Sequence, residues 1–135
     1  DLQTIDGAGA AGGLGGALAG VLQGEMKSGF QVIADLVEFE SAVKEADLVL
    51  TGEGRLDGQS AQGKVPVEVG KIAYKHGVPA VAVAGEVAQE GIYAPLTSVF
   101  SIQTGPCSLE EALDENISYA NIRHVSEQIV RLRLK

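Results

Sequence analysis

Two short, unbroken apolar runs limit the folds open to this chain more than any other feature. Residues 47–51 read DLVLT and residues 80–84 read AVAVA, and neither run alternates with polar side chains. Strands of this kind are typical of a parallel sheet that helices cover on both faces. The segment between them carries apolar residues at helical spacing, with Pro66 in its first turn and Gly77 and Pro79 at its end. The sequence therefore predicts a strand–helix–strand unit of the α/β class.

Local patterns extend this unit in both directions. They predict a strand or extended lead-in over 30–37, a short helix over 38–46 and a third strand over 98–102. Ser108 and Glu111 have the spacing of a capping box. A helix is therefore expected from Leu109 toward the C-terminus, with a break near 114–116.

A glycine-rich segment occupies the N-terminal part of the chain. Residues 7–24 hold eight of the 18 glycines, and a turn followed by a helix is expected there. Gly7-x-Gly9-x-x-Gly12 has the spacing of a dinucleotide fingerprint, but only a weak strand candidate precedes it. Two interpretations stay open. The glycines form either an anion-binding loop that uses backbone N–H groups or a purely structural tight turn.

Composition and charge exclude several classes of function. Ten Lys and Arg against 18 Asp and Glu give a net charge of −8, so the basic footprint of a nucleic-acid-binding protein is missing. The longest uncharged stretch, residues 7–24, is too weakly apolar for a membrane helix. Cys107 is the only cysteine, which excludes an internal disulfide framework and a cysteine-rich zinc site. We therefore expect a reducing, cytoplasmic environment, and neither nucleic acid nor membrane as a partner.

The strongest functional signal follows the first apolar run. Ligands of open α/β sheets bind beyond the carboxyl ends of the strands. That rule indicates the polar loop expected over 52–63, the turn at 85–86 and the region 103–105. The first place is the richest, because glycines there alternate with charged residues of both signs.

The residue types in this loop suit phosphate chemistry. Carboxylates such as Glu53 and Asp57 can hold Mg²⁺ or accept a proton, and Arg55 and Lys64 can neutralise a phosphate or a carboxylate. The alternative is a solvated surface loop whose charges serve solubility. The length of the loop, its glycines and its position after a buried strand favour function.

Residues 58–64 also match the start of a P-loop. Val65 then stands where a Ser or Thr would bind Mg²⁺, and the loop begins too far beyond the strand. The match is interpreted as coincidence, and only Lys64 is kept as a candidate phosphate contact near a helix N-terminus.

Four segments, in order, resemble the bacterial glycerate kinase family, and in particular the class of the glycerate 2-kinases. They are GAGAAGG from Gly7, KSG from Lys27, LVLTGEGR from Leu48 and GKVP from Gly63. The resemblance covers nearly the whole chain. It implies that the chain corresponds to the C-terminal third of family members, whose upstream part would hold a second glycine-rich motif and most of an inserted domain.

The resemblance also implies a fold of two α/β domains with the active site in the cleft between them. One domain has a three-layer, parallel-sheet, Rossmann- or flavodoxin-like architecture and is built from both ends of the chain. Residues 38–135 would be its C-terminal part. Residues 1–37 would be a glycine-rich loop and helix that belong to, or cross from, the second domain.

The activity implied by the resemblance is transfer of the ATP γ-phosphate to D-glycerate, which gives 2-phosphoglycerate and requires Mg²⁺.

The resemblance also implies the site residues, through the positions that match the family. The catalytic set is Glu53, Arg55, Asp57 and Lys64. Glu53 and Asp57 are also the metal candidates, and the catalytic base is not assigned. The cofactor-binding set is Gly7, Gly9, Gly12, Gly13, Thr51, Gly52 and Gly54. Asp6 departs from the family pattern, because many relatives carry Pro there.

Three hypotheses follow for the chain as a whole. It is part of a kinase and inactive without its N-terminal portion, or a stand-alone nucleotide- or anion-binding α/β module, or a dehydrogenase-type dinucleotide domain. The last lacks a clear acidic residue at a strand end, although Asp35 lies near the required spacing. A C-terminal third would expose apolar surface, so a homodimer is also expected.

Overall fold

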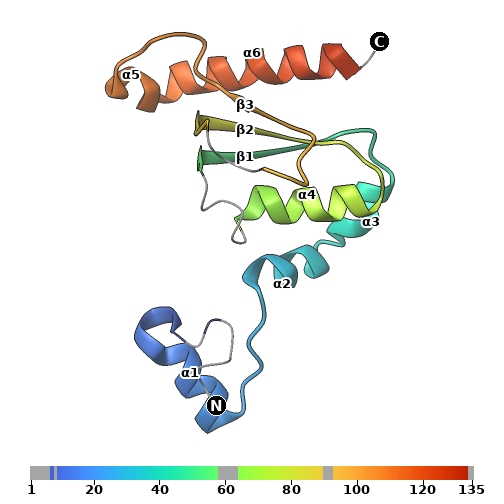
Figure 1. Cartoon of the computed structure of the whole chain (residues 1–135), viewed down its shortest axis with the longest axis vertical. Coiled ribbons are helices and arrows are strands. Elements are labelled where there is room, and N and C mark those ends of the chain that lie inside the picture. The colour runs from blue at the N-terminus through green and yellow to red at the C-terminus, as the bar shows by residue number, and fades with distance from the viewer. Residues whose placement is uncertain (1–6, 8, 58–63, 90–92, 134–135) are drawn as a thin grey trace. The chain divides into compact units, whose positions relative to one another are not determined.

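A computed structural model describes residues 7, 9–57, 64–89 and 93–133 of the chain (Figure 1). The chain divides into two compact units, Asp1–Val37 and Glu38–Lys135. That these units belong to two domains of one larger fold stays a prediction. Among the described residues, no helix is both long enough and apolar enough to cross a membrane.

The larger unit is built on a parallel sheet of three described strands. These are β1 (Val49–Leu56), β2 (Ala80–Val87) and β3 (Ser98–Ser101), in the order β1-β2-β3. In the register, Val49 is paired with Ala80, and Val81 is paired with Ser98. The expected α/β class with parallel strands is confirmed.

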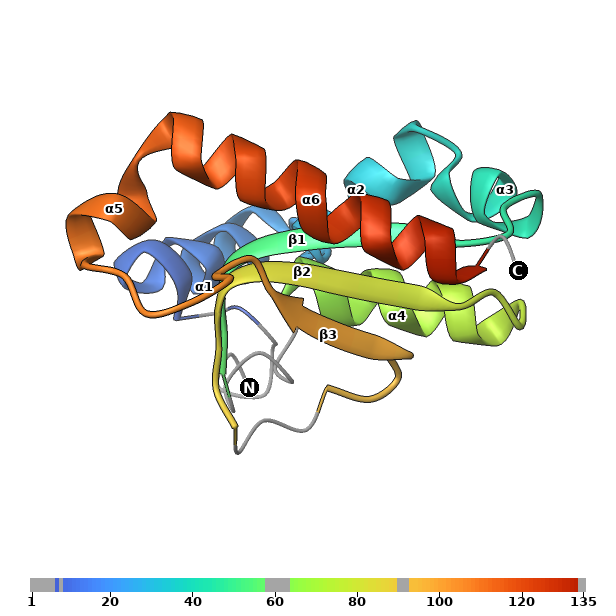
Figure 2. The same ribbon diagram turned by 90° about the horizontal axis from the view of Figure 1, so that it is seen from above.

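Helices cover both faces of this sheet. α4 (Val65–Lys75) packs on β1 and β2, whereas α6 (Glu115–Arg133) packs on β2 from the opposite face (Figures 1 and 2). α3 (Phe39–Lys44) lies against α4, and α5 (Leu109–Leu113) lies against the start of α6. The central strand β2 is accordingly the most buried, with Ala80, Val81, Ala82 and Ala84 all in the core.

Several predicted helix ends are confirmed. Gly77 follows α4 with a left-handed backbone, φ +69°, which an L-residue with a Cβ adopts at a cost. The capping box is formed, because the Glu111 N–H donates to Ser108 Oγ (3.2 Å) and the Ser108 N–H donates to Glu111 Oε2 (2.8 Å). The expected break lies at Asp114, whose carboxylate accepts the Ile117 N–H at the start of α6 (2.9 Å).

The smaller unit holds the glycine-rich turn and helix. α1 (Ala10–Leu22) contains a kink, because residues 11–13 have left-handed φ values of 51°, 69° and 93°. The regular right-handed helix begins only after them, as expected from a turn followed by a helix. A Cβ added at Gly15 would lie 2.5 Å from the Gly7 carbonyl oxygen, so this glycine permits a close backbone approach.

The structure corrects three expectations. The apolar run 30–37 is not extended but belongs to α2 (Gly29–Leu36), because Phe30, Ile33 and Ala34 recur at helical spacing. β1 and β2 continue beyond the two apolar runs, so Gly52–Leu56 lies in a strand rather than a loop, and 85–86 is not a turn.

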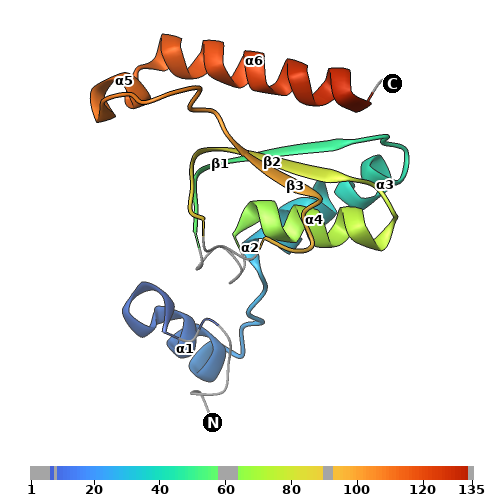
Figure 3. The ribbon, with the colours of Figure 1, turned by 45° about the horizontal axis from the view of Figure 1, so that its top comes forward.

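The strand extensions depend on pairing and on glycine. β1 and β2 bend together toward their carboxyl ends (Figure 3), and glycine in a strand often marks a bend or a close approach of two backbones. A Cβ added at Gly85 would lie 2.8 Å from the Gly54 carbonyl oxygen. The Tyr93 hydroxyl lies within hydrogen-bonding distance of the carbonyl oxygens of Leu56 (3.1 Å) and Ala88 (2.7 Å), which holds the two strand ends together.

Gly85→Ala is expected to destabilise the larger unit by about 1–3 kcal/mol, because the new methyl group meets a backbone oxygen that cannot easily move. Urea unfolding followed by circular dichroism measures the change. Gly105→Ala is the control, since a Cβ there meets no atom within 4 Å and its effect is expected to stay within about 0.5 kcal/mol. Equal losses in the two variants would contradict the close approach.

An ion pair joins α3 to the end of α4 and predicts a pH effect. Lys75 Nζ and His76 Nε2 each lie 2.7 Å from Glu40 Oε1, and these hydrogen bonds lower the pKa of Glu40 from 4.5 to about 2. A lowered folded-state pKa stabilises the fold above the unfolded pKa, and this contribution is lost as the pH falls through the folded value.

Glu40→Gln should therefore lower the free energy of unfolding at pH 7, and the difference from the parent chain should shrink between pH 4.5 and pH 2. Urea titrations across that range measure it. Glu45→Gln is the control, because Glu45 forms no ion pair within the described part of the chain. A difference that persists at low pH would exclude the Glu40 charge as its cause.

Candidate functional site

The predicted catalytic residues gather at the carboxyl end of β1. Glu53 and Arg55 lie in the strand itself, Asp57 follows the strand directly, and Lys64 immediately precedes α4. Residues 58–63, which are all of the P-loop-like segment except Lys64, lie outside the described residues, as does Asp6.

Three of these residues and a neighbour from β2 form one group of charges. Arg55 Nε lies 3.6 Å from Asp57 Oδ2 and 3.6 Å from Glu86 Oε2. Lys64 Nζ lies 3.4 Å from Asp57 Oδ1 and donates a hydrogen bond to the Arg55 carbonyl oxygen (3.2 Å). Arg55, Asp57, Lys64 and Glu86 are called the charged cluster below.

Glu86 was missed as a member of the cluster, because its neighbourhood was interpreted as a turn. The parallel register pairs Arg55 with Glu86, so their side chains leave the same face of the sheet as neighbours. No sequence signal identifies this pair, because alignment of the starts of the two apolar runs, Asp47 and Ala80, would place Arg55 opposite Ala88. The pairing follows from the register of the folded sheet, in which Val49 rather than Asp47 lies opposite Ala80.

Glu53 lies on the same edge but outside the ion-pair network. Its Oε1 accepts the Gly54 N–H (3.1 Å), and its side chain is exposed. Three carboxylates, Glu53, Asp57 and Glu86, thus share this edge with two cations, Arg55 and Lys64. Among the described residues, no three His, Cys, Asp or Glu side chains are placed to hold a metal ion by themselves.

This arrangement suits an Mg²⁺ ion that arrives bound to a phosphate rather than one that the protein holds by itself. Mg²⁺ usually keeps several waters and binds one or two carboxylates together with substrate phosphates. A polyanion that approached this edge without a metal would be repelled by the excess of carboxylates. Mg²⁺ bound to the polyanion would offset part of that repulsion.

A pocket of about 440 Å³ adjoins the charged cluster. Gly54 and Gly85 line it from the ends of β1 and β2, together with Glu86, Gln103 and residues of α5. The remaining predicted β1 positions lie farther back along the strand, where Thr51 is paired with Ala82 and Gly52 with Val83. Of the predicted strand residues, Gly54 is therefore the one that lines this pocket.

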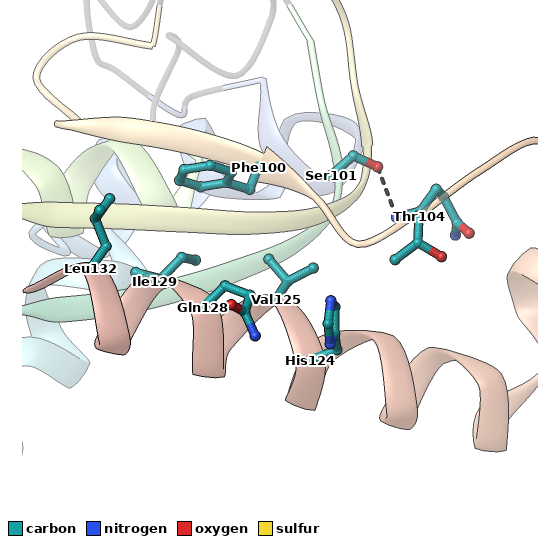
Figure 4. Close-up of a pocket in the computed structure, with 9 residues that line it drawn as sticks. Phe100, Ser101, Thr104, His124, Val125, Gln128, Ile129 and Leu132 are labelled. Carbon is teal, nitrogen blue, oxygen red and sulfur yellow. Dashed lines mark hydrogen bonds between the residues drawn. The ribbon is translucent and has the colours of Figure 1, made fainter.

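Two residues of the third predicted ligand place, Gln103 and Thr104, line a second groove, and Gln103 also lines the pocket beside the charged cluster. The β3–α6 groove has a volume of about 570 Å³, and its lining includes Phe100, Gln103, Val125, Ile129 and Leu132. Thr104 and His124 lie at one end of it (Figure 4). The Gln103 N–H donates to Ser101 Oγ (3.1 Å), which fixes the chain where it leaves β3. This groove contains no member of the charged cluster.

The glycine candidates Gly7, Gly9, Gly12 and Gly13 lie in the smaller unit. Gly7, Gly12 and Gly13 have positive φ values, so a residue with a Cβ would be strained there, whereas Gly9 has an ordinary backbone conformation. The Gly13 N–H donates to the Gly9 carbonyl (3.3 Å), so this donor is used within the turn.

Fold and cluster together define an α/β protein whose charged, glycine-lined edge lies at the carboxyl ends of parallel strands, where such sheets bind ligands. A family model described as the glycerate kinase family matches residues 1–134. The chain belongs to the glycerate kinase family.

Individual relatives agree with this assignment. The glycerate kinase of Bacillus subtilis is 42% identical over 120 residues, which cover 87% of this chain and 31% of the relative. The glycerate 2-kinase of Escherichia coli is 40% identical and covers 96% of this chain and 34% of the relative. A solved structure from Salmonella typhimurium LT2, provisionally named glycerate kinase 2, superimposes with a TM-score of 0.63 at 36% identity over 96% of this chain and 34% of its own. The chain thus spans about one third of the length of the relatives it matches.

The excess of carboxylates at the site predicts metal-dependent binding of phosphates. Pyrophosphate titrated into the chain should bind several-fold more tightly with Mg²⁺ than with EDTA, as measured by isothermal titration calorimetry. Asp57→Asn should reduce that dependence, because it removes one competing carboxylate and one candidate metal ligand. Asp47→Asn, before the opposite end of β1, is the control. Equal binding with and without metal would contradict the charge argument.

Proposed function

We propose that this chain is the part of a glycerate kinase that supplies one wall of a phosphoryl-transfer site, with D-glycerate as acceptor, ATP as donor and 2-phosphoglycerate as product. The observation that carries the proposal is the charged cluster at the carboxyl ends of β1 and β2 in a chain of this family. Phosphoryl transfer needs positioning and charge neutralisation more than covalent chemistry, and the cluster offers both.

The two cations have distinct roles in the proposal. Arg55 offers a planar guanidinium that can bind a carboxylate or a phosphate through two parallel hydrogen bonds. Its Nε lies between two carboxylates, which would orient the plane. Lys64 is a point charge at the N-terminus of α4, where the helix dipole also favours an anion.

The carboxylates serve the metal and the acceptor. Asp57 is partly buried between Lys64 and Arg55, so its position is restrained. Together with Glu53 it is the candidate that holds the hydrated Mg²⁺ of the nucleotide. When bound, Mg²⁺ would neutralise the charge that develops on the transferred phosphate. A reducing, cytoplasmic environment belongs to the same proposal and is supported by the single, exposed Cys107.

The length of the relatives bears on activity. The relatives named above are about three times as long as this chain. An in-line transfer needs the acceptor hydroxyl and the leaving ADP to be held from opposite sides. We therefore propose that the second wall comes from the rest of a full-length enzyme and that the 135-residue chain alone has little or no turnover. A nucleotide- or anion-binding module without catalysis is the competing function.

A coupled ADP-release assay with D-glycerate, ATP and Mg²⁺ tests the proposal. Activity is expected in a full-length protein that carries this chain and not in the chain alone. In the full-length protein, Arg55→Ala should lower kcat/KM by roughly a hundredfold or more, since it removes a cation from the site.

Arg131→Ala is the matched control. Arg131 is an exposed arginine that is paired with Glu127 on α6 (2.8 Å), and it lies outside the charged cluster. Its loss should leave kcat/KM within about twofold. Release of ADP without dependence on glycerate would remove this acceptor, and phosphate binding without any turnover in the full-length protein would favour the competing function.

A further inference from the structure

The pocket beside the charged cluster has features that the transfer of a phosphate to a three-carbon acid leaves unexplained. The α5 pocket is lined by Glu86, Gln103, Leu109, Ala112 and Leu113, together with strand-end glycines. Its volume of about 440 Å³ lies within the range of small-molecule sites. Glycerate would fill only a small part of it.

The wall formed by α5 is unusually apolar for an exposed surface. Leu109 is 75% exposed and Leu113 is 74% exposed, and α5 has no buried residue. A five-residue helix gains nothing for its own stability from two exposed leucines. A ligand with a flat apolar face would bury them, whereas a fully hydroxylated acid would not.

Two polar side chains on the pocket wall can form further hydrogen bonds. The Gln103 side-chain carbonyl accepts a hydrogen bond from Cys107 Sγ (3.3 Å), while its amide nitrogen has no partner among the described residues. The Glu86 carboxylate is 61% exposed and meets Arg55 through one oxygen. Ser108, in contrast, uses its hydroxyl in the helix cap and is not available.

The order of these groups matches the order of parts in a nucleoside phosphate. Glu86 belongs both to the charged cluster and to the α5 pocket, so the two sites share a border. A carboxylate at such a border suits ribose hydroxyl groups, and cations beyond it suit phosphates. Leu109 and Leu113 then remain for the base.

We propose that the α5 pocket holds the nucleoside of the phosphate donor. The base packs against Leu109 and Leu113 and receives a hydrogen bond from the Gln103 amide, and the ribose lies at Glu86. The phosphates point toward Arg55 and Lys64. This inference rests on the proposed function for the identity of the donor, but the pocket itself can be tested without any turnover.

The first test uses the ¹⁵N-labelled 135-residue chain with adenosine, ADP with Mg²⁺, and pyrophosphate with Mg²⁺ as separate probes. Adenosine and ADP should shift the amide signals of residues 103 and 109–113. Pyrophosphate should leave the signals of α5 in place. An adenosine titration that does not move the α5 signals would overturn the proposal.

Matched leucine variants separate a pocket effect from a general surface effect. Leu113→Gln should weaken ADP binding about tenfold, because the apolar contact is lost, and should leave pyrophosphate binding unchanged. Leu132→Gln, at an equally exposed leucine of α6 outside the α5 pocket, should change neither. Equal weakening of ADP by both variants would also overturn the proposal.

In a full-length enzyme, Leu113→Gln should raise KM for ATP and leave KM for glycerate unchanged. Failure of the two proposals can thus be told apart. An active glycerate kinase whose ATP KM is unaffected by Leu113→Gln contradicts the nucleoside site alone. Adenosine binding in the α5 pocket without glycerate-dependent ADP release contradicts the glycerate kinase activity alone.

Discussion

The parallel pairing of β1 with β2 past the end of their apolar runs is the constraint on which the rest of the site depends. It continues to Leu56 and Val87, and the Leu56 carbonyl accepts the Ala88 N–H just beyond the ladder (2.8 Å). Leu56 is fully buried in a cluster with Ala82 and Ala84. This buried leucine anchors a strand end whose other side chains are polar, so Arg55 is carried on backbone that the core holds in place.

The same pairing explains why some elements of the fold can be predicted from the sequence and others cannot. The apolar runs, the proline and glycine around α4 and the capping box of α5 are local signals, and each element they predict is present. The segment TGEGRL has no such local signal, since glycine and charge are both unfavourable in strands. It is a strand because β2 supplies hydrogen-bond partners along its length, which is a tertiary effect.

The candidate site could likewise be predicted only in part. Glu53, Arg55, Asp57 and Lys64 could be named from residue type and from the rule that ligands bind beyond strand ends. Glu86 required the register. The α5 pocket required the path of the chain from β3 through Gln103 to α5, which no motif encodes. Sequence reasoning thus found the charges that one segment carries, and the fold added the groups brought in by neighbouring strands and helices.

The ion pairs of the charged cluster are too weak to build the site by themselves. Arg55 is 61% exposed, and its two carboxylate contacts at 3.6 Å are longer than good charge-assisted hydrogen bonds. Exposed pairs of this kind contribute roughly 0.2–1 kcal/mol each. The backbone of the paired strands therefore fixes where these charges lie. Because little energy is stored in the internal pairs, a magnesium–phosphate complex could replace them at small cost, while the paired strands keep the backbone that carries these charges in position.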